Sequence, residues 1–548
     1  MKSMAWPAMV TATSAIYVAI AKLSERFDID TPGVERPLLT VLVLFTVAFA
    51  MYLLSIWMVR RAPTKEAMAW ILAGGLIFRV IMCLSLPIQE VDIYRYLWDG
   101  AVAGQGVSPF LFSPMQVRDG QLGDIEDPRM QQLIDLLDAE PALNEVLHRV
   151  HYPGLPTVYP VVSQATFAAV HHVTPSGSSL KTRLRWMKAA LIGFDLATVW
   201  VVVLILRCCR IPTAFVVTYA WCPLLLKEVA GSGHLDSIAV FLTALAVWML
   251  IRVVSIETGD AVAGSLFRGG LTATAMVLAL AVGAKLYPII LAPMFLLVSL
   301  RRLGWRSLIV PSITFLTMIA AFAFPMLPPH SNPTRSDPSQ GMEAFLRHWE
   351  INDFLFMLIV ENLRPAADAP SVWFAVIPEV WRATACETLS MWTGISISEI
   401  PFLVTRLVTL SIFGLIALPL AWNTAHKAGA TSSAMLADEH ESATHLVSAT
   451  FQTIAWFWLL CPTQNPWYWV WVLPFLPLAR SRAWIAMSGL LMIYYLRFWF
   501  DYRGVPNVCG TPYQGVQFFD YVVVWLEYFP WFCMLMAESI YRRGIKAS

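Results

Sequence analysis

Charged residues are scarce in this chain and nearly balanced in sign. Only 14% of its 548 residues are Asp, Glu, Lys or Arg, and 38 basic residues stand against 37 acidic ones, which leaves a formal net charge of +1. A protein that binds nucleic acid needs a basic surface, because it has to neutralise phosphates. The composition therefore argues against a nucleic-acid partner.

Several catalytic motifs are also missing. The eight cysteines include no CxxC pair, and the chain has no Gly-rich phosphate loop, HExxH or GxSxG pattern. These absences argue against a paired-cysteine zinc or redox centre, against ATP-driven work and against a serine or zinc hydrolase. The energy for any reaction must then come from the substrate itself or from a gradient.

Long apolar runs dominate instead. Hydrophobic residues make up 57% of the chain. Runs such as Leu38 to Met58 and Ala67 to Leu86 reach the roughly 20 residues that a helix needs to cross a bilayer. We predict an all-α polytopic membrane protein with about 12 to 13 transmembrane helices.

The basic residues between these runs predict the orientation. RRAPTK from Arg60, RRLGWR at 301–306 and YRRGIK at 541–546 are typical of cytoplasmic segments. Two polar segments with amphipathic helices then lie outside. We expect N-terminal helices (1–66), a helical module (67–423) with external segments 88–157 and 327–399, a cytoplasmic linker (424–445) and C-terminal helices (446–548).

The apolar run 268–300 leaves two topologies open, because it is too long for one straight span and too short for two comfortable ones. If it breaks into two helices around Lys285, residues 233–236 face outside. If it forms one bent helix, they face inside. The cost of His234, Asp236 and Lys285 at membrane depth favours the first arrangement, in which they line a functional cavity.

Polar chemistry is concentrated in QEVDIYRYLWDG, residues 89–100. Asp92 follows the end of the third apolar run, where a carboxylate can accept a proton from a hydroxyl as general base. On a helix, Asp92, Arg95 and Asp99 share one face, and Tyr94 suits the membrane interface or a sugar ring. The alternative is a helix end anchored by aromatic residues, with Arg95 neutralising the two acids.

Further polar residues interrupt apolar sequence. KEVAGSGHLDS (227–237) brings together His234 and Asp236, and a simple turn would explain its glycines but not this pair. Lys285 lies inside the run 268–300, and its alternative is to snorkel to the surface. Tyr159 stands where the chain returns to the membrane, which could be only a helix start, and Glu350 and Asn352 lie in an expected external amphipathic segment. The remaining candidates stand at expected outer helix ends, where an aromatic belt alone would explain the rings: Asn465, Trp467, Tyr468 and Arg497.

The polar motifs follow one another in a particular order. VDIYRYLWDG and GVSPF precede YPVVSQ, GSGHLD, AKLYP, an FxxxWxxN pattern and NPWYWVW, all between Pro87 and Tyr502. In order and spacing this resembles the bacterial polyprenyl-phosphate-sugar glycosyltransferases of the GT-C superfamily, and within it the mannosyltransferase-like members. The chain departs from the family pattern at Ser108, where asparagine is expected, and at Val161, where a second proline is common; both concern sugar and acceptor specificity.

The resemblance implies a GT-C-like helical bundle in the bacterial cytoplasmic membrane, with the active site on the external face. It implies inverting transfer of a hexose, such as mannose, from a polyprenyl-phosphate donor to a lipid or glycan acceptor. Asp92 matches the external acid that serves this family as general base. We infer that Arg95, Lys285 and Arg497 are candidates to hold the donor phosphate, because cations suit the charge of that leaving group.

The rival hypothesis is a transporter or flippase for a polar lipid or solute, with His234, Asp236 and Lys285 along its pathway. The two hypotheses differ at Asp92, because a base does not tolerate asparagine whereas a gating acid should leave partial transport. No cofactor or metal ligand is assigned, and a divalent cation stays open. The expected partners are the sugar donor, the acceptor and membrane lipids.

Overall fold

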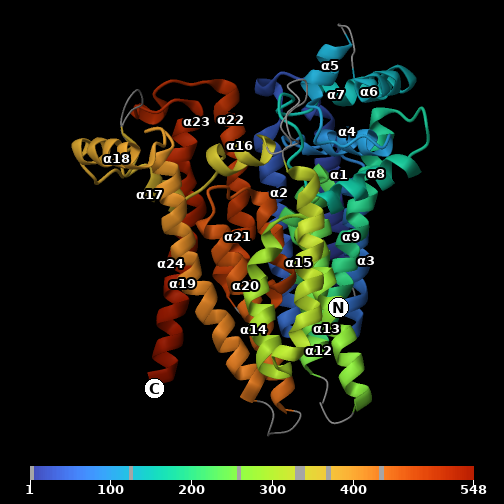
Figure 1. Ribbon diagram of the computed structural model, residues 1–548, viewed down its shortest axis with the longest axis vertical. Coiled ribbons are helices and arrows are strands. Elements are labelled where there is room, and N and C mark those ends of the chain that lie inside the picture. The colour runs from blue at the N-terminus through green and yellow to red at the C-terminus, as the bar shows by residue number, and fades with distance from the viewer. Residues whose placement is uncertain are drawn as a thin grey trace.

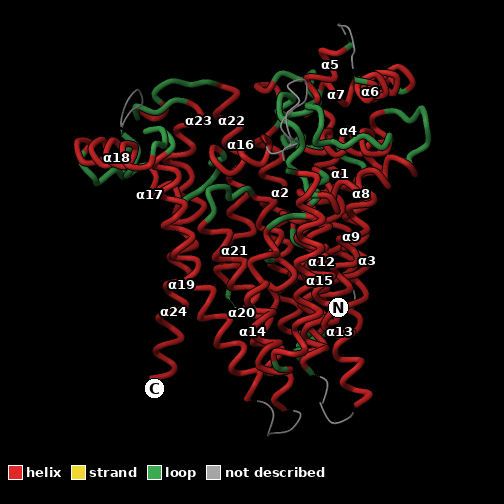
Figure 2. The backbone as a smooth tube through the Cα atoms, in the orientation of Figure 1, coloured by secondary structure: helices red, strands yellow, loops and turns green. Residues whose placement is uncertain are grey.

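The computed structural model describes residues 5–121, 127–255, 261–327, 340–365, 372–430, 437–479 and 481–547. This part of the chain is helical, and its β-type pairing amounts to one isolated bridge between Ile351 and Thr463. Long helices run alongside one another in a bundle, and shorter helices and loops gather at one end (Figures 1 and 2).

Nine helical segments in the described residues are long and apolar enough to cross a membrane. A tenth results if Thr213–Ala220 and Pro223–Ser232, which meet at 50°, form one broken span. The chain is therefore a multi-pass helical membrane protein. The nine are α1 with η2 (Ala5–Phe27), α2 (Leu38–Arg61), α3 (Lys65–Cys83), α9 (Leu180–Cys208), α12 (Asp236–Val254), η7 to η8 around α15 (Trp305–Met326), most of α19 (Ile400–Ala430), α21 to α22 (Arg482–Arg503) and α23 to α24 (Gly515–Arg542).

The predicted number of 12 to 13 is higher than the structure shows, because several apolar runs form short or interrupted helices. Proline lacks a backbone N–H and cannot continue an α-helix, and prolines stand at many of these breaks. The shorter elements are α8 (Val161–Val173), η6 (Tyr287–Leu291), α14 (Ala292–Leu303), η10 (Pro466–Trp471) and η11 (Leu473–Leu478), and α13 (Ala261–Ala284) has a short apolar part at Gly269–Ala284. The 24-residue helix α20 (Ala437–Leu460) completes the bundle.

The run 268–300 has the first of its two predicted arrangements. Helix α13 ends at Ala284, and η6 and then α14 follow Lys285. The residues after the break pack back against α12 and α19. The chain therefore turns at Lys285, inside the protein.

One end of the bundle, which we call the loop-rich end, carries the two segments predicted to be external (Figure 1). The opposite end contains the C-terminus of α24 (Val524–Ala547). The helices of the loop-rich end are α4 (Asp92–Gly104), α5 (Pro114–Gly120), α6 (Pro128–Ala139), α7 (Pro141–His148), α16 (Gln340–His348), α17 (Leu355–Val360) and α18 (Glu379–Thr393).

The predicted linker 424–445 is mostly helical. Helix α19 continues to Ala430 and α20 begins at Ala437, and the two helices pack together. Residues 431–436 lie outside the described part of the chain. The small and polar residues of this segment therefore form helix on both sides of the connection.

A buried ion pair joins α3 to α9 within the bundle. Arg79 of α3 and Asp195 of α9 are fully buried, with 2.5 Å between Nε and Oδ2. Tyr219 of α10 (Val217–Ala220) donates to Asp195 Oδ1 over 2.7 Å. Because a charge in the bilayer interior is stable only when it is paired and hydrogen-bonded, this network holds α3, α9 and α10 in register.

Candidate functional site

Asp92 is the first residue of α4, at the loop-rich end. Its side chain is half-buried and has no hydrogen-bond or ion-pair partner among the described residues. The N-terminus of a 13-residue helix favours a negative charge at this position. The Asp92 carboxylate also lies within electrostatic range of Lys285 and Tyr468. It is thus a partly exposed acid within electrostatic range of a cation that is also partly exposed.

Lys285 and Asp236 form the centre of the site. Lys285 Nζ lies 2.5 Å from Asp236 Oδ1, and the same oxygen accepts a hydrogen bond of 2.5 Å from Trp471 Nε1. Asp236 is completely buried, whereas the Lys285 side chain keeps 17% of its surface exposed. We call Asp92, Asp236, Lys285, Tyr468 and Trp471 the central cluster.

Aromatic rings surround the Lys285 ammonium. It lies 4.2 Å from the centroid of the Tyr468 ring, which stacks on Trp471 with 4.5 Å between centroids. Tyr287 covers Trp471 in a second stack, at 4.2 Å. The ion pair and the face of the Tyr468 ring therefore stabilise the Lys285 charge where it lies. The alternative, in which Lys285 snorkels to the surface, is not required to explain its charge.

The segment before Asp236 adopts an unusual backbone. Residues Leu226–Ser232 form a π-helical turn, labelled η5, and Gly233 follows with φ of +75°. A Cβ on Gly233 would lie 2.5 Å from Ile93 Cδ1. Glycine is required here both for the left-handed backbone and for the close approach of α4. This contact places Asp92, next to Ile93, near Asp236.

His234 stacks on Trp467 with 4.5 Å between ring centroids and an interplanar angle of 9°. Its Nε2 atom lies 3.4 Å from Glu228 Oε2. Glu228 also contacts Lys227, at 3.2 Å, and accepts a short hydrogen bond from Tyr495. The imidazole is thus part of a buried ionic group that adjoins the central cluster.

Glu90 is a second acid of this region, which the sequence argument did not single out. It lies two residues before Asp92, and its Oε1 atom is buried without a hydrogen-bond partner in the described part of the chain. Burial raises the pKa of its carboxyl to about 8, against the opposing charge of Lys227 and with further increases from Asp92 and Glu228. The sequence pattern ExD, which places Glu90 two residues before Asp92, could have identified Glu90 as a second candidate acid.

Tyr159 precedes α8 and reaches the same region. Its ring packs edge-on against Tyr96, with 5.0 Å between centroids. Burial, followed by the charge of Asp92, raises the pKa of the Tyr159 phenol well above its usual value. The phenol therefore stays protonated and can donate a hydrogen bond beside Asp92.

Asn352 and Asn465 are brought together by the isolated bridge. Ile351 and Thr463 pair in parallel, and Asn352 Nδ2 then donates to Glu527 Oε2 over 3.0 Å. The Oδ1 atoms of both asparagines are buried and have no hydrogen-bond partner within the described residues. Asn465 caps η10, the helix that carries Tyr468.

Arg95 and Asp99 serve mainly to hold the loop after α7. Arg95 Nη2 donates to the carbonyl oxygens of Tyr152 and Leu155, each over 3.0 Å. Asp99 accepts from Gln164 Nε2 over 2.9 Å. No ion pair joins Arg95 to Asp92 or Asp99 in the described structure. Burial raises the pKa of the Asp99 carboxyl, and the Arg95 charge acts against this increase, so part of the neutralising role considered from the sequence is present at Asp99.

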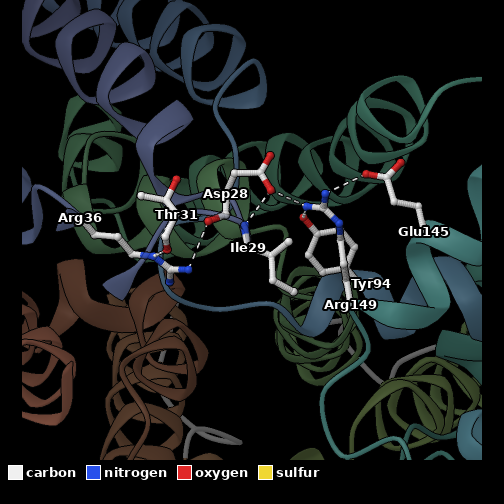
Figure 3. Close-up of polar contacts among 7 residues, drawn as sticks. All are labelled: Asp28, Ile29, Thr31, Arg36, Tyr94, Glu145 and Arg149. Atoms are coloured by element: carbon white, nitrogen blue, oxygen red, sulfur yellow. Dashed lines mark hydrogen bonds and ion pairs between the residues drawn. The ribbon is translucent and has the colours of Figure 1, made fainter. Parts of the chain in front are cut away.

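Tyr94 points away from the central cluster. Arg149 Nη1 lies 3.4 Å from the Tyr94 hydroxyl and 2.8 Å from Asp28 Oδ1, and Glu145 also binds Arg149 (Figure 3). The side chain of Tyr94 therefore connects α4 to the loop between α1 and α2. This placement gives no support to its predicted contact with substrate.

Glu350 and Arg497 also have partners of their own. Glu350 Oε2 lies 2.9 Å from Arg364 Nη2, and Arg497 Nε lies 3.0 Å from Asp520 Oδ1. Arg497 remains close enough for its charge to act on Glu90. Neither residue contacts the central cluster directly.

No group of three or more His, Cys, Asp or Glu side chains is arranged to hold a metal ion in the part of the chain that the structure describes. Comparisons with protein-family models, with curated proteins and with solved structures return no match. The class of protein that the fold defines is a multi-pass helical membrane protein with a buried polar site at its loop-rich end.

Proposed function

We propose that this protein is an inverting glycosyltransferase of the GT-C type. It moves a hexose, of the mannose class, from a polyprenyl-phosphate donor to an acceptor hydroxyl. The observation that carries the proposal is the juxtaposition of two partly exposed groups, Asp92, an acid without a hydrogen-bond or ion-pair partner among the described residues, and Lys285, a cation. The order of sequence motifs between Pro87 and Tyr502 supports the same class.

Asp92 is suited to act as the general base. The acceptor hydroxyl attacks the anomeric carbon, its proton passes to the Asp92 carboxylate, and the bond between that carbon and the phosphate oxygen breaks with inversion. A phosphate-linked sugar carries its own activation, so the missing nucleotide motif agrees with this chemistry. Glu90 stays protonated near neutral pH, because its pKa is raised to about 8, and therefore adds little negative charge beside the leaving phosphate.

Lys285 is the best placed cation for the leaving phosphate. An ammonium has three donors, and one of them is directed at Asp236 Oδ1. The others are available to phosphate oxygens, whose charge grows as the bond breaks. Arg95 and Arg497 contribute less to the proposal, because backbone carbonyls and Asp520 already engage them.

The loop-rich end would be the external face. Arginines at the opposite end, where Arg60 of α2 and Arg542 of α24 line one cavity, fit the bias of basic residues toward the cytoplasm. The central cluster would then face the side on which polyprenyl-linked sugars are presented to external acceptors.

The test is transfer of labelled sugar from a panel of polyprenyl-phosphate sugars, in vesicles that carry the full chain at matched expression. Asp92→Asn should lower the transfer rate by about 10²-fold or more, because it removes the base, while donor binding persists. Asp138→Asn, at an exposed acid of α6, is the matched control and should transfer at the wild-type rate.

Equal rates for Asp92→Asn and the wild type would overturn the assignment of the base. If the wild type transfers none of the sugars in the panel, the glycosyltransferase proposal fails, and uptake or flipping of the same lipids in the same vesicles then tests the transporter hypothesis.

A further inference from the structure

A cavity opens at the end of the bundle opposite the central cluster. Its volume is about 860 Å³. The walls come from the ends of α2 and α24, the connection after α9, η11 and the start of α21. The lining residues are Arg60, Ile211, Phe215, Pro477, Arg482, Ala537, Glu538, Tyr541 and Arg542.

The cavity has an excess of positive charge. Three arginines face one acid, Glu538. Glu538 Oε1 accepts hydrogen bonds from the backbone N–H groups of Arg482 and Ala483, over 2.6 and 3.3 Å, and its Oε2 lies 3.9 Å from Arg542 Nη2. The side chains of Arg60 and Arg482 have no hydrogen-bond or ion-pair partner among the described residues, so their donors are open to a ligand.

The remaining walls are apolar. Ile211, Phe215, Pro477 and Ala537 line the cavity between the arginines. Arg60 lies at the C-terminal end of the membrane-spanning helix α2, and the C-terminus of α24 marks this end of the bundle in Figure 1. The cavity thus combines charged side chains at the end of a membrane-spanning helix with apolar surface, which matches an amphipathic ligand.

We propose that this cavity binds the phosphate headgroup of an anionic membrane lipid. Arg60 and Arg482 donate to the phosphate oxygens, because a guanidinium matches phosphate geometry with two parallel donors. Basic pockets between transmembrane helices at the cytoplasmic surface hold anionic headgroups in this manner. The site is independent of the proposed transfer reaction, since its residues belong to the other end of the bundle.

Native mass spectrometry of the purified full chain tests the proposal, with phosphatidylglycerol and phosphatidylcholine of identical acyl chains as probes. The wild type should retain phosphatidylglycerol in preference to phosphatidylcholine. The double variant Arg60→Gln/Arg482→Gln should lose affinity for phosphatidylglycerol by about fivefold per arginine, at about 1 kcal/mol each. Its thermal midpoint should stay unchanged, because the backbone of residue 482, and not its side chain, binds Glu538.

Arg61→Gln is the matched control. Arg61 is adjacent to Arg60 but lies over the Trp57 ring, 5.1 Å from its centroid, and does not line the cavity. Equal retention of the two lipids by the wild type, or equal losses in Arg61→Gln and the double variant, would overturn the proposal. Displacement of phosphatidylglycerol by millimolar inorganic phosphate would overturn the lipid assignment and point to a soluble phosphate ligand instead.

Discussion

Lys285 and Asp236 come from segments 49 residues apart, yet their charged atoms lie 2.5 Å apart at the centre of the site. Asp236 begins α12, and Lys285 stands at the break between α13 and η6. The break itself brings the lysine to the start of α12, so the interruption of an apolar run and the position of the lysine within it have one structural explanation. A straight helix through residues 268–300 would carry Lys285 past Asp236.

This pair gives the first prediction. Lys285→Met should lower the free energy of unfolding by about 3 to 5 kcal/mol, because it leaves the buried Asp236 carboxylate without its partner. The double variant Asp236→Asn/Lys285→Met should recover most of that loss, since neither buried charge remains. Transfer should be lost in both. The measurements are thermal or denaturant unfolding of the purified chain and the vesicle transfer assay.

The pattern across the two assays separates a structural role from a catalytic one. A double variant that regains both stability and transfer would show that Lys285 serves only the fold. A double variant as unstable as the single one would contradict the energetic argument for the pair.

The second prediction concerns Glu90 and pH. Burial raises the pKa of this carboxyl to about 8 in the folded chain, so the folded state holds a proton that the unfolded state releases near pH 4.5. The stability that this proton contributes is fully present below pH 4.5 and is lost as the pH rises through about 8. Glu90→Gln stays neutral throughout, so its thermal midpoint should fall less than that of the wild type between pH 6 and pH 9. If the thermal midpoints of the two proteins fell equally between pH 6 and pH 9, the raised pKa of Glu90 would be refuted.

Sequence alone predicted the helical membrane class and named several residues that the structure brings close together, but it did not predict their pairing. The length of an apolar run reflects the thickness of the bilayer, so the helical membrane class follows from composition and run length. The described residues contain nine or ten candidate spans and not 12 to 13, because hydrophobicity does not show where proline breaks a helix. Two such breaks precede η6 and η10, where Pro288 and Pro466 stand in the first turn of each helix.

The site residues also divide into those that the sequence identifies and those that depend on tertiary contacts. His234, Asp236 and Lys285 were found because a charge is costly at membrane depth, and the structure places them in one buried region. Tyr94 was predicted because an aromatic ring suits the membrane interface or a sugar, and residue type does not reveal that Arg149 and Asp28 would lie on that face of α4. Glu90 was missed because its surroundings, and not its position, raise its pKa.

The third prediction tests the contact between Gly233 and α4. Gly233→Ala should lower the thermal midpoint and the transfer rate, because alanine is strained at φ of +75° and its Cβ would lie 2.5 Å from Ile93 Cδ1. Gly394→Ala is the matched control, since Gly394 also has a left-handed backbone, with φ of +71°, and open space around it. The control should lose only the free energy of the strained backbone, about 1 to 2 kcal/mol, and keep its transfer rate. A transfer rate in Gly233→Ala equal to that of Gly394→Ala would show that the approach of α4 to residues 233–236 is not needed for activity.

The fourth prediction compares two tyrosines that flank Asp92 in different ways. The Tyr159 phenol lies within the electrostatic range of Asp92, whereas the Tyr94 phenol contacts Arg149 on the far face of α4. Tyr159→Phe should lower kcat/KM for transfer about tenfold, because the phenol then no longer donates a hydrogen bond to a charged group of the substrate beside Asp92. Tyr94→Phe should stay within about twofold of the wild-type rate, since its hydrogen bond from Arg149 is long, at 3.4 Å, and contributes little. Both variants keep the aromatic ring, so a difference between them reports on the hydroxyl alone, and a larger loss of transfer in Tyr94→Phe than in Tyr159→Phe would place the substrate on the Arg149 side of the helix.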